Sequence, residues 1–454
     1  MNENGYLIEE PIQPMENGGS PYSFALGILS VLLFVIAHAT GFSVLLYVGA
    51  LAMAFNFAMF SEDFLCLELL YLPLSPILKF SPEGAALLSY ISLLGIFVFL
   101  IKRKVVDIDL TYLLVGAGLL ALFLFKQVFQ SFGISMVYIR LVITMMVAAI
   151  YFDLRTREAD ITAQEMYRAN LFLTWGILLA SMVGYLFVEN VNFSRYISVD
   201  TNYIGEKIVS RFSGVSGDPN YYSALVVFAI ASNLCHFIHR PRVSHIVYAV
   251  VLTAFGILSL SKMFLLLLAV TLILFLIGWI RTQGGFSTKG IASVLLIAAG
   301  MLVGGYFILN SESVQLIFAR MGASSDLNEL TTGRSDTWLE YIKEIFGSLE
   351  YFLFGIDRNS KIAGVHVTHN TFLQIWWKVG LLGMLLVGSW FALIWYRGNR
   401  GRFTGMLMLL VGCFGATLAL DMLFFDQLFW FFILIMMYNQ AVLSEEEPAG
   451  RWEK

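Results

Sequence analysis

The stretch MFLLLLAVTLILFLIGWI, residues 263–280, carries no charged side chain. At a rise of about 1.5 Å per residue, a helix of this length nearly crosses the roughly 30 Å hydrocarbon core of a bilayer. Similar apolar segments recur along most of the chain of 454 residues. Because one soluble core cannot bury so many of them, the sequence predicts a polytopic membrane protein.

The composition supports this class and excludes others. Hydrophobic residues make up 58% of the chain and charged residues 13%, against about 45–50% and about 25% in a soluble domain. The net charge is −4 and the basic residues are scattered, so nucleic acid is not an expected partner. The three cysteines lie inside apolar segments, which predicts core residues rather than disulfides or a zinc site: Cys66, Cys235 and Cys413.

The expected fold is an all-α polytopic integral membrane protein with about 12–14 transmembrane helices. The predicted spans are 21–38, 42–60, 64–80, 84–101, 109–126, 134–152, 168–187, 220–238, 243–260, 263–280, 288–309, 371–396, 403–420 and 422–440. Segment 64–80 contains Pro73 and Pro76, so we expect it to be kinked or re-entrant.

Short loops rich in Lys and Arg predict the orientation, because such loops prefer the cytoplasm. These clusters, around 102–104, 155–157, 240–242, 281–289 and 397–402, all fall on one side if every segment crosses. Both termini are then cytoplasmic. The predicted organisation is a disordered cytoplasmic tail 1–20, a single transmembrane domain 21–440 and a cytoplasmic tail 441–454. Two longer extracytoplasmic loops remain, 188–219 and 310–370. Loops of this length are usually functional or disordered, and helix-compatible stretches in these two predict that they are organised.

The first of these loops ends in RFSGVSGDPNY, residues 211–221. Its two glycines permit tight turns, Asp218 suits a helix N-cap and Pro219 suits the first turn. The exposed helix N-terminus favours anions, so Arg211 beside it is expected to bind a diphosphate, with Asp218 and Asn220 among the substrate-binding residues. The alternative is an ordinary capped helix with a snorkelling interfacial arginine.

A second candidate, Lys262, follows Ser261 in the tight outer turn between two predicted spans. Its ammonium group is expected to meet a lipid phosphate at the membrane surface. Interfacial lysines are common without any function, and that alternative stays open.

The third candidate is Arg334 in the stretch TTGRSDTW, residues 331–338. Apolar residues then recur with a helical period and predict an amphipathic helix on the outer membrane surface: Trp338, Ile342, Ile345 and Phe346. Arg334 would again stand at a helix N-terminus, although a surface helix with solvated charges is the alternative.

The fourth candidate is the segment from His366 to Gln374, which opens a predicted span. Thr371 and Gln374 have the spacing of a capping box. His369 lies just before the cap, where an imidazole can take a proton from an attacking hydroxyl. No third ligand with clear spacing accompanies His366 and His369, so neither a metal nor another cofactor is expected.

Other charges carry weaker signals. Arg140 lies one to two turns inside its span, where it is expected either to bind substrate or to snorkel outward. Asp421 and Asp426, at the outer junction of the last two spans, are further functional candidates, and the alternative expectation is that they only mark a short exposed turn. Three histidines are expected in a solvated cytoplasmic loop without a special role: His236, His239 and His245.

Taken together, these motifs resemble the bacterial O-antigen ligase and polymerase superfamily over about residues 200–390. They stand in the same order: 211–220, the Ser261–Lys262 turn, Gly333–Trp338 with the Phe354–Gly355 break, and His369–Asn370 with 373–383. One departure is Lys262, where relatives usually carry an arginine; it keeps the charge but loses the bidentate fork.

The resemblance implies a metal-independent glycosyltransferase of the membrane-embedded GT-C type in the bacterial cytoplasmic (inner) membrane. It would transfer glycan from undecaprenyl diphosphate to a sugar hydroxyl on the extracytoplasmic face, alongside membrane lipid and other polysaccharide assembly proteins. Arg211, Arg334 and Lys262 would hold the diphosphate and His369 would be the general base. Asn370 would orient the acceptor, and Trp338 would stack on sugar or lie in the aromatic belt.

Within this resemblance, a polysaccharide polymerase is expected. The alternatives are a ligase, which passes the finished glycan to lipid A core or protein, and a transporter of lipid-linked oligosaccharides. Transporters place charges near the bilayer midplane on broken helices and show repeated halves. Here the charges gather at the outer edge and no repeat is evident in the sequence.

Overall fold

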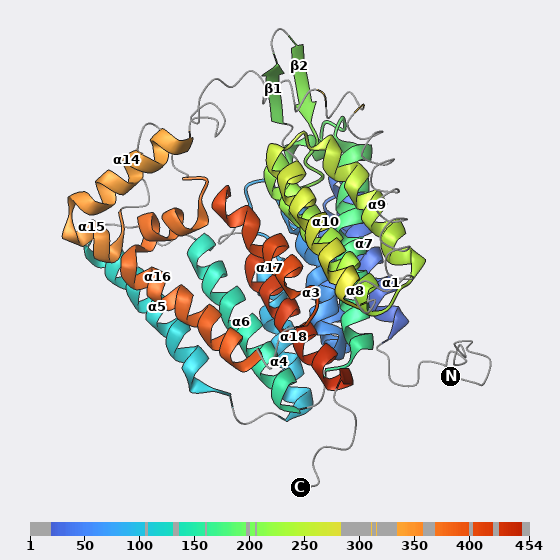
Figure 1. Cartoon of the computed structure of the whole chain (residues 1–454), viewed down its shortest axis with the longest axis horizontal. Coiled ribbons are helices and arrows are strands. Elements are labelled where there is room, and N and C mark those ends of the chain that lie inside the picture. Colours follow the sequence, from blue (N-terminus) through green and yellow to red (C-terminus); the bar gives the residue numbers. More distant parts are fainter. Residues whose placement is uncertain are drawn as a thin grey trace.

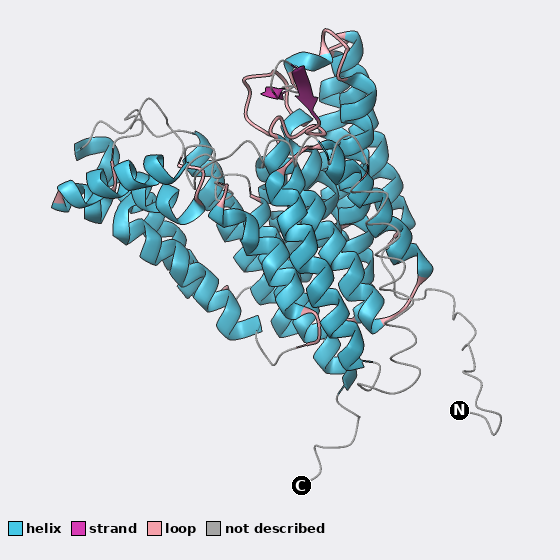
Figure 2. Ribbon diagram, turned by 45° about the horizontal axis from the view of Figure 1, so that its top comes forward, coloured by secondary structure: helices cyan, strands magenta, loops and turns pink. Residues whose placement is uncertain are grey.

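The computed structural model describes residues 20–104, 108–129, 136–158, 161–196, 200–204, 207–282, 310, 315, 334–356, 368–398, 403–420 and 426–446. Within these residues the chain is mainly helical, and most helices form one bundle (Figures 1 and 2). The all-α polytopic class predicted from the sequence is confirmed at this level.

The helices of the first part are α1 (Pro21–Thr40), α2 (Val44–Met59), α3 (Phe64–Tyr71), α4 (Leu88–Arg103), α5 (Leu110–Phe129), α6 (Met136–Glu158), α7 (Ala163–Phe187), α8 (Pro219–His239), α9 (Val243–Leu258) and α10 (Lys262–Thr282). The later helices are α14 (Arg334–Gly347), α15 (Leu349–Phe354), α16 (Thr371–Gly398), α17 (Met406–Phe414) and α18 (Gln427–Glu446). Short 3-10 turns are η1 (Ser61–Asp63), η2 (Leu72–Ile77), η3 (Phe193–Arg195) and η4 (Gly415–Leu418).

Six helices of the described part are long and apolar enough to cross a membrane: α1, α5, α7, α8, α10 and α16. The protein is therefore a multi-pass membrane protein. Helix α2 and the run Ser61–Ile77 pass the same test together, but they are bent by 96°, the geometry of a broken span or a re-entrant loop. Three further apolar segments are shorter: α9, the run from α17 into η4, and α18. The predicted count of about 12–14 spans is thus not confirmed, and segment 288–309 lies outside the described residues.

The broken run carries the two prolines of the predicted segment 64–80. Pro73 and Pro76 lie in η2, where the α-helix has already given way to a 3-10 turn, because proline lacks the N–H that an α-helix needs. The run lies along α1: Ser23 Oγ donates to Asp63 Oδ2 at 2.6 Å, and His38 Nε2 lies 2.8 Å from the Ile77 carbonyl oxygen.

Helix α8 lies at the centre of the bundle, and 89% of its apolar 18-residue stretch is buried. It contacts α7, α9, α10 and α17, and Phe228 stacks on Phe431 of α18 at 3.8 Å between ring centroids. Apolar residues on every side suit such an enclosed helix. The segment before α8 packs closely on α7, since a Cβ at Gly184 would lie 2.4 Å from the backbone of Gly214.

A two-stranded antiparallel hairpin lies at one end of the bundle, which we call the hairpin end (Figure 1). Its strands are β1 (Asp200–Ile204) and β2 (Lys207–Arg211), and Arg211 pairs with Asp200. The sequence predicts helix-compatible stretches in loop 188–219, and the two strands correct this expectation for residues 200–204 and 207–211.

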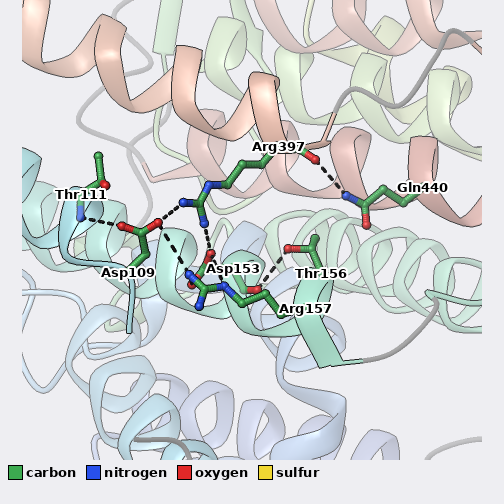
Figure 3. A network of polar contacts seen from close by, with 7 residues as sticks. All are labelled: Asp109, Thr111, Asp153, Thr156, Arg157, Arg397 and Gln440. Carbon is green, nitrogen blue, oxygen red and sulfur yellow. Dashed lines mark hydrogen bonds and ion pairs between the residues drawn. The ribbon is translucent and has the colours of Figure 1, made fainter. Parts of the chain in front are cut away.

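The opposite end carries a charge network (Figure 3). The guanidinium of Arg397, near the end of α16, contacts the carboxylates of both Asp109 and Asp153. Arg157 reaches the same two carboxylates, at 3.6 Å and 2.9 Å. The predicted basic clusters at 155–157 and 397 therefore meet at the end of the bundle away from the hairpin.

Candidate functional site

The N-terminus of α8 is built as its sequence predicts. Pro219 is the first helical residue, and the Asp218 carboxylate accepts from the backbone N–H groups of Asn220, at 2.7 Å, and Tyr221, at 3.2 Å. The cap satisfies donors that a helix start leaves without partners. Asp218 therefore serves the helix end, with its charge placed at the hairpin end of the bundle.

Asn220 joins the first and second sequence motifs. Its side-chain oxygen accepts from Arg211 Nη2 at 3.1 Å and from Ser261 Oγ at 2.9 Å. Arg211 also donates through Nε to the Ser259 carbonyl oxygen at 3.2 Å. Lys262 follows directly as the half-buried first residue of α10. Two motifs about 40 residues apart in the chain are thus held together by one amide oxygen.

Arg334 is the first residue of α14, as predicted, and its Nη1 donates to the Ala419 carbonyl oxygen at 2.9 Å. Burial lowers the pKa of Arg334, the nearby charge of Asp218 opposes this shift and that of Arg211 adds to it. Arg334 therefore lies within electrostatic reach of the Arg211–Asp218 segment. The tertiary structure brings the first and third motifs together.

His369 lies in the short segment 368–370 before α16, in the left-handed region at φ 53°. A non-glycine residue adopts this conformation only where the surroundings hold it. Part of that hold comes from Trp338, whose Nε1 donates to the buried Thr368 carbonyl oxygen at 2.7 Å. In this structure the polar group of Trp338 positions the histidine segment.

The pKa of His369 is lowered, first by burial, then by the positive charge of Arg334, and Asp218 opposes the shift. A lowered pKa leaves the imidazole neutral at neutral pH, which is the form that accepts a proton. Three segments far apart in the chain therefore share one electrostatic environment: those of Asp218, Arg334 and His369.

Helix α16 begins with a cap other than the predicted one. Asn370 Oδ1 accepts from the Leu373 backbone N–H at 3.1 Å. The predicted capping box of Thr371 and Gln374 is wrong, because the Gln374 side-chain oxygen accepts instead from the Thr368 N–H at 2.8 Å. Gln374 thus stabilises the segment 368–370. Asn370 caps helix α16, and this role is separate from the predicted contact with substrate.

Three consecutive carbonyl oxygens at the end of η4, those of residues 418–420, accept side-chain hydrogen bonds from the site. Backbone oxygens carry partial negative charge, so this segment anchors donors from two different elements. The bonds are Asn370 Nδ2 to Leu418 O at 3.3 Å, Arg334 Nη1 to Ala419 O at 2.9 Å and Thr371 Oγ1 to Leu420 O at 2.5 Å. The sequence offered no signal for them, since any residue supplies a carbonyl.

The glycines of the third and fourth motifs meet where α15 packs on α16. Gly355 and Gly380 have φ of 76° and 67°, and a Cβ on Gly380 would lie 2.3 Å from the Leu353 oxygen. Lys126 of α5, fully buried, donates to the carbonyl oxygens of residues 354 and 378 at 2.7 Å and 2.9 Å. Sequence reasoning missed Lys126, although a lysine inside an apolar segment is itself a signal.

Arg140 has a different partner from the predicted substrate. Its Nε lies 3.2 Å from Asp426 Oδ2 in an ion pair, and the Asp426 side chain is 5% exposed. The expectation of an exposed turn at Asp426 is wrong, because the carboxylate turns inward to Arg140. Asp421 and His366 lie outside the described residues.

The histidines of α8 and α9 are not in a solvated loop as expected. His236 and His245 are buried, with exposed fractions of 6% and 1%, and their rings stack at 5.6 Å between centroids. The His239 ring nitrogen Nε2 lies 2.8 Å from the Thr404 carbonyl oxygen. The expectation failed because the end of α8 is enclosed by other helices.

The three cysteines are buried and free, as predicted. Among the residues that the structure describes, no group of three or more His, Cys, Asp or Glu side chains is arranged to hold a metal ion.

Comparison with known proteins adds no relative: the chain matches no model of a known protein family and no curated protein.

Proposed function

We propose that the protein is a polysaccharide polymerase that transfers a glycan from undecaprenyl diphosphate to a sugar hydroxyl on the extracytoplasmic face. The observation that carries the proposal is the meeting of Arg211, Arg334 and His369, from separate motifs, at the hairpin end of the bundle. With the arginine-rich end of Figure 3 in the cytoplasm, as the distribution of basic loops favours, this site faces outward.

The diphosphate of the donor would be held by Arg211 and Arg334. Arg211 donates to the Ser259 carbonyl oxygen and the Asn220 amide oxygen, and Arg334 donates to the Ala419 carbonyl oxygen; these three acceptors are neutral. No carboxylate of a described residue lies within 4.0 Å of Arg334. A half-buried cation in this setting favours an anionic ligand, and planar guanidinium groups match phosphate oxygens.

His369 would be the general base. The acceptor hydroxyl oxygen attacks the anomeric carbon of the donor sugar, the bond from that carbon to the diphosphate oxygen breaks, and the hydroxyl proton passes to the neutral imidazole. The leaving diphosphate gains negative charge, which Arg211 and Arg334 stabilise, with Lys262 at the neighbouring turn. The lowered pKa of His369 supports this role, because the imidazole is free to accept a proton at neutral pH.

An apolar cavity of about 270 Å³ supports a lipid-linked donor. It begins at Thr371, next to His369 and Asn370, and continues between α16, α17 and α18. Its lining includes Phe372, Phe391, Phe414 and Leu428. A polyprenyl tail entering here would leave its headgroup beside the cations.

A transporter of lipid-linked sugars is the second candidate, favoured by one specific observation. The broken run Ser61–Ile77 carries Glu68, a fully buried carboxyl group in the interior of the bundle. Broken helices with buried charges are typical of coupling sites in transporters. A ligase would use the same outward site with another acceptor.

The experiment is to incubate the purified protein in liposomes with an undecaprenyl-diphosphate oligosaccharide repeat unit and to separate the products by length. A ladder of multimers that is absent with Arg334→Ala and with His369→Ala supports the polymerase. The matched control is Lys343→Ala, which removes an exposed cation from the same helix α14 and should leave the ladder intact.

Two other outcomes decide between the remaining candidates. Transfer only after lipid A core or an acceptor protein is added identifies a ligase. Movement of the lipid-linked sugar across the bilayer, unchanged by His369→Ala and without glycan transfer, contradicts an enzyme and favours the transporter.

A further inference from the structure

Glu68 of α3 is one of the most deeply buried charged residues in the bundle, with an exposed fraction of 1%. It lines a small cavity between α3, α4, α6 and the start of α18. The cavity also contains three hydroxyl groups and a second carboxyl group: Ser89, Ser92, Thr144 and Asp426. This polar cluster plays no part in the proposed transfer reaction.

Neither carboxyl oxygen of Glu68 has a hydrogen-bond partner among the described residues. An ionised carboxylate without a partner in an apolar interior is unfavourable by many kcal/mol. Something must therefore neutralise Glu68, either a cation or a proton.

The surroundings of Glu68 favour a proton over a cation as the neutralising group. Arg140 Nε lies 3.2 Å from Asp426 Oδ2, so this guanidinium already faces the other carboxyl group of the cavity. At the start of α3, Asp63 and Arg168 pair with each other at 3.0 Å. The cavity has no room for a water-sized sphere, which excludes a hydrated cation in this conformation.

We propose that Glu68 carries a proton at neutral pH and forms, with Asp426 ionised against Arg140, an intramembrane proton-binding site. Hydroxyl groups form a short chain on the Asp426 side of the cavity: Ser89 Oγ donates to Asp426 Oδ2 at 3.3 Å, and Thr144 Oγ1 donates to Ser89 Oγ at 3.4 Å. Ser92 lines the cavity beside Glu68. Such hydroxyl groups can both donate and accept, as proton transfer requires.

Release of the proton would have a structural consequence at the hairpin end. A second carboxylate would then lie in the same cavity as that of Asp426, so Asp426 and the start of α18 would feel a new repulsion. Asp426 follows, by a few residues, the segment 418–420 whose carbonyl oxygens hold Arg334 and Asn370. The proton site is thus placed to influence the outward site, whatever reaction occurs there.

Infrared spectroscopy of the full-length protein in liposomes at neutral pH tests the proposal. The carbonyl stretch of a protonated carboxyl group is expected in the wild type and lost in Glu68→Gln, which keeps the shape of the side chain. It should persist in Asp426→Asn, since that carboxylate is ionised, and in the matched control Glu344→Gln, which changes an exposed glutamate of α14.

A measurement without mutation guards against variants that fail to fold. In wild-type protein labelled with carbon-13 glutamate, the protonated-carboxyl band should shift to lower frequency. A band that is unaffected by both the label and Glu68→Gln overturns the proposal. A band that disappears in Asp426→Asn but not in Glu68→Gln places the proton on Asp426 and overturns it as well.

Discussion

Trp338→Phe tests whether the indole of α14 positions the histidine segment. The substitution keeps most of the aromatic ring but removes the Nε1 donor, which lies 2.7 Å from the Thr368 carbonyl oxygen. Thr368 is fully buried, so its oxygen would be left without this donor. Leaving a buried acceptor unsatisfied costs about 1–3 kcal/mol.

The expected effect on transfer follows from that free energy. If this free energy is lost from the ordering of residues 368–370, the fraction of molecules in which the segment holds His369 in its observed conformation decreases by about 5–150-fold. Because Trp338 acts through Thr368, we expect donor affinity and maximal rate to change more than the pH dependence of transfer. The assay is the length ladder with its initial rate, combined with thermal unfolding of the same sample.

Trp376→Phe is the matched control. Its Nε1 donates to the Phe352 carbonyl oxygen at 3.1 Å, in the same apolar cluster between α14, α15 and α16. We expect it to lower thermal stability by a comparable amount, about 1 kcal/mol, and to spare transfer once folded. Equal loss of transfer in both variants, or full transfer by Trp338→Phe, would refute the positioning role.

Three further predictions concern the site, the packing and the opposite end. Arg334→Gln removes a positive charge that lowers the pKa of His369, so that pKa should rise. The acid limb in the pH profile of the residual transfer rate should then move to higher pH. An acid limb that stays or moves to lower pH contradicts the assignment of His369 as the base. Gly380→Ala places a Cβ 2.3 Å from a backbone oxygen at φ 67°, whereas Gly347 has nothing within 4 Å; thermal unfolding should show a large loss for the first and nearly none for Gly347→Ala. Arg397→Met removes a partner of the Asp153 carboxylate, which is 1% exposed. It should lower the free energy of unfolding by less than the roughly 3–5 kcal/mol lost when a fully buried ion pair is broken, without altering the affinity of the folded protein for the donor.

The helices could be predicted because their signals are local. Apolar segments as long as a bilayer is thick occur at the predicted places, and most described helices coincide with them. The same holds for the starts of α8 and α14: the Asp218 cap and the position of Arg334 depend on residues only a few places away.

Local patterns misled where burial depended on the rest of the bundle. The sequence places His236 and His245 near a basic loop, but the helices around α8 enclose both. It places Asp426 at a turn, but the nearest guanidinium, that of Arg140, comes from a segment almost 300 residues earlier. The periodicity of apolar residues in α6 and α18 does not indicate which of their polar residues face each other.

The sequence by itself thus determined the class of protein, the course of most helices and the residues able to carry phosphate and proton chemistry, since length, hydropathy and caps act over one segment. Only the tertiary structure decided which of these residues share a site. It joined Arg211 to Ser261 through Asn220, brought Arg334 near Asp218 and His369, and left Glu68 in a small buried cavity. These contacts depend on packing between segments far apart in the chain, and no local pattern encodes them.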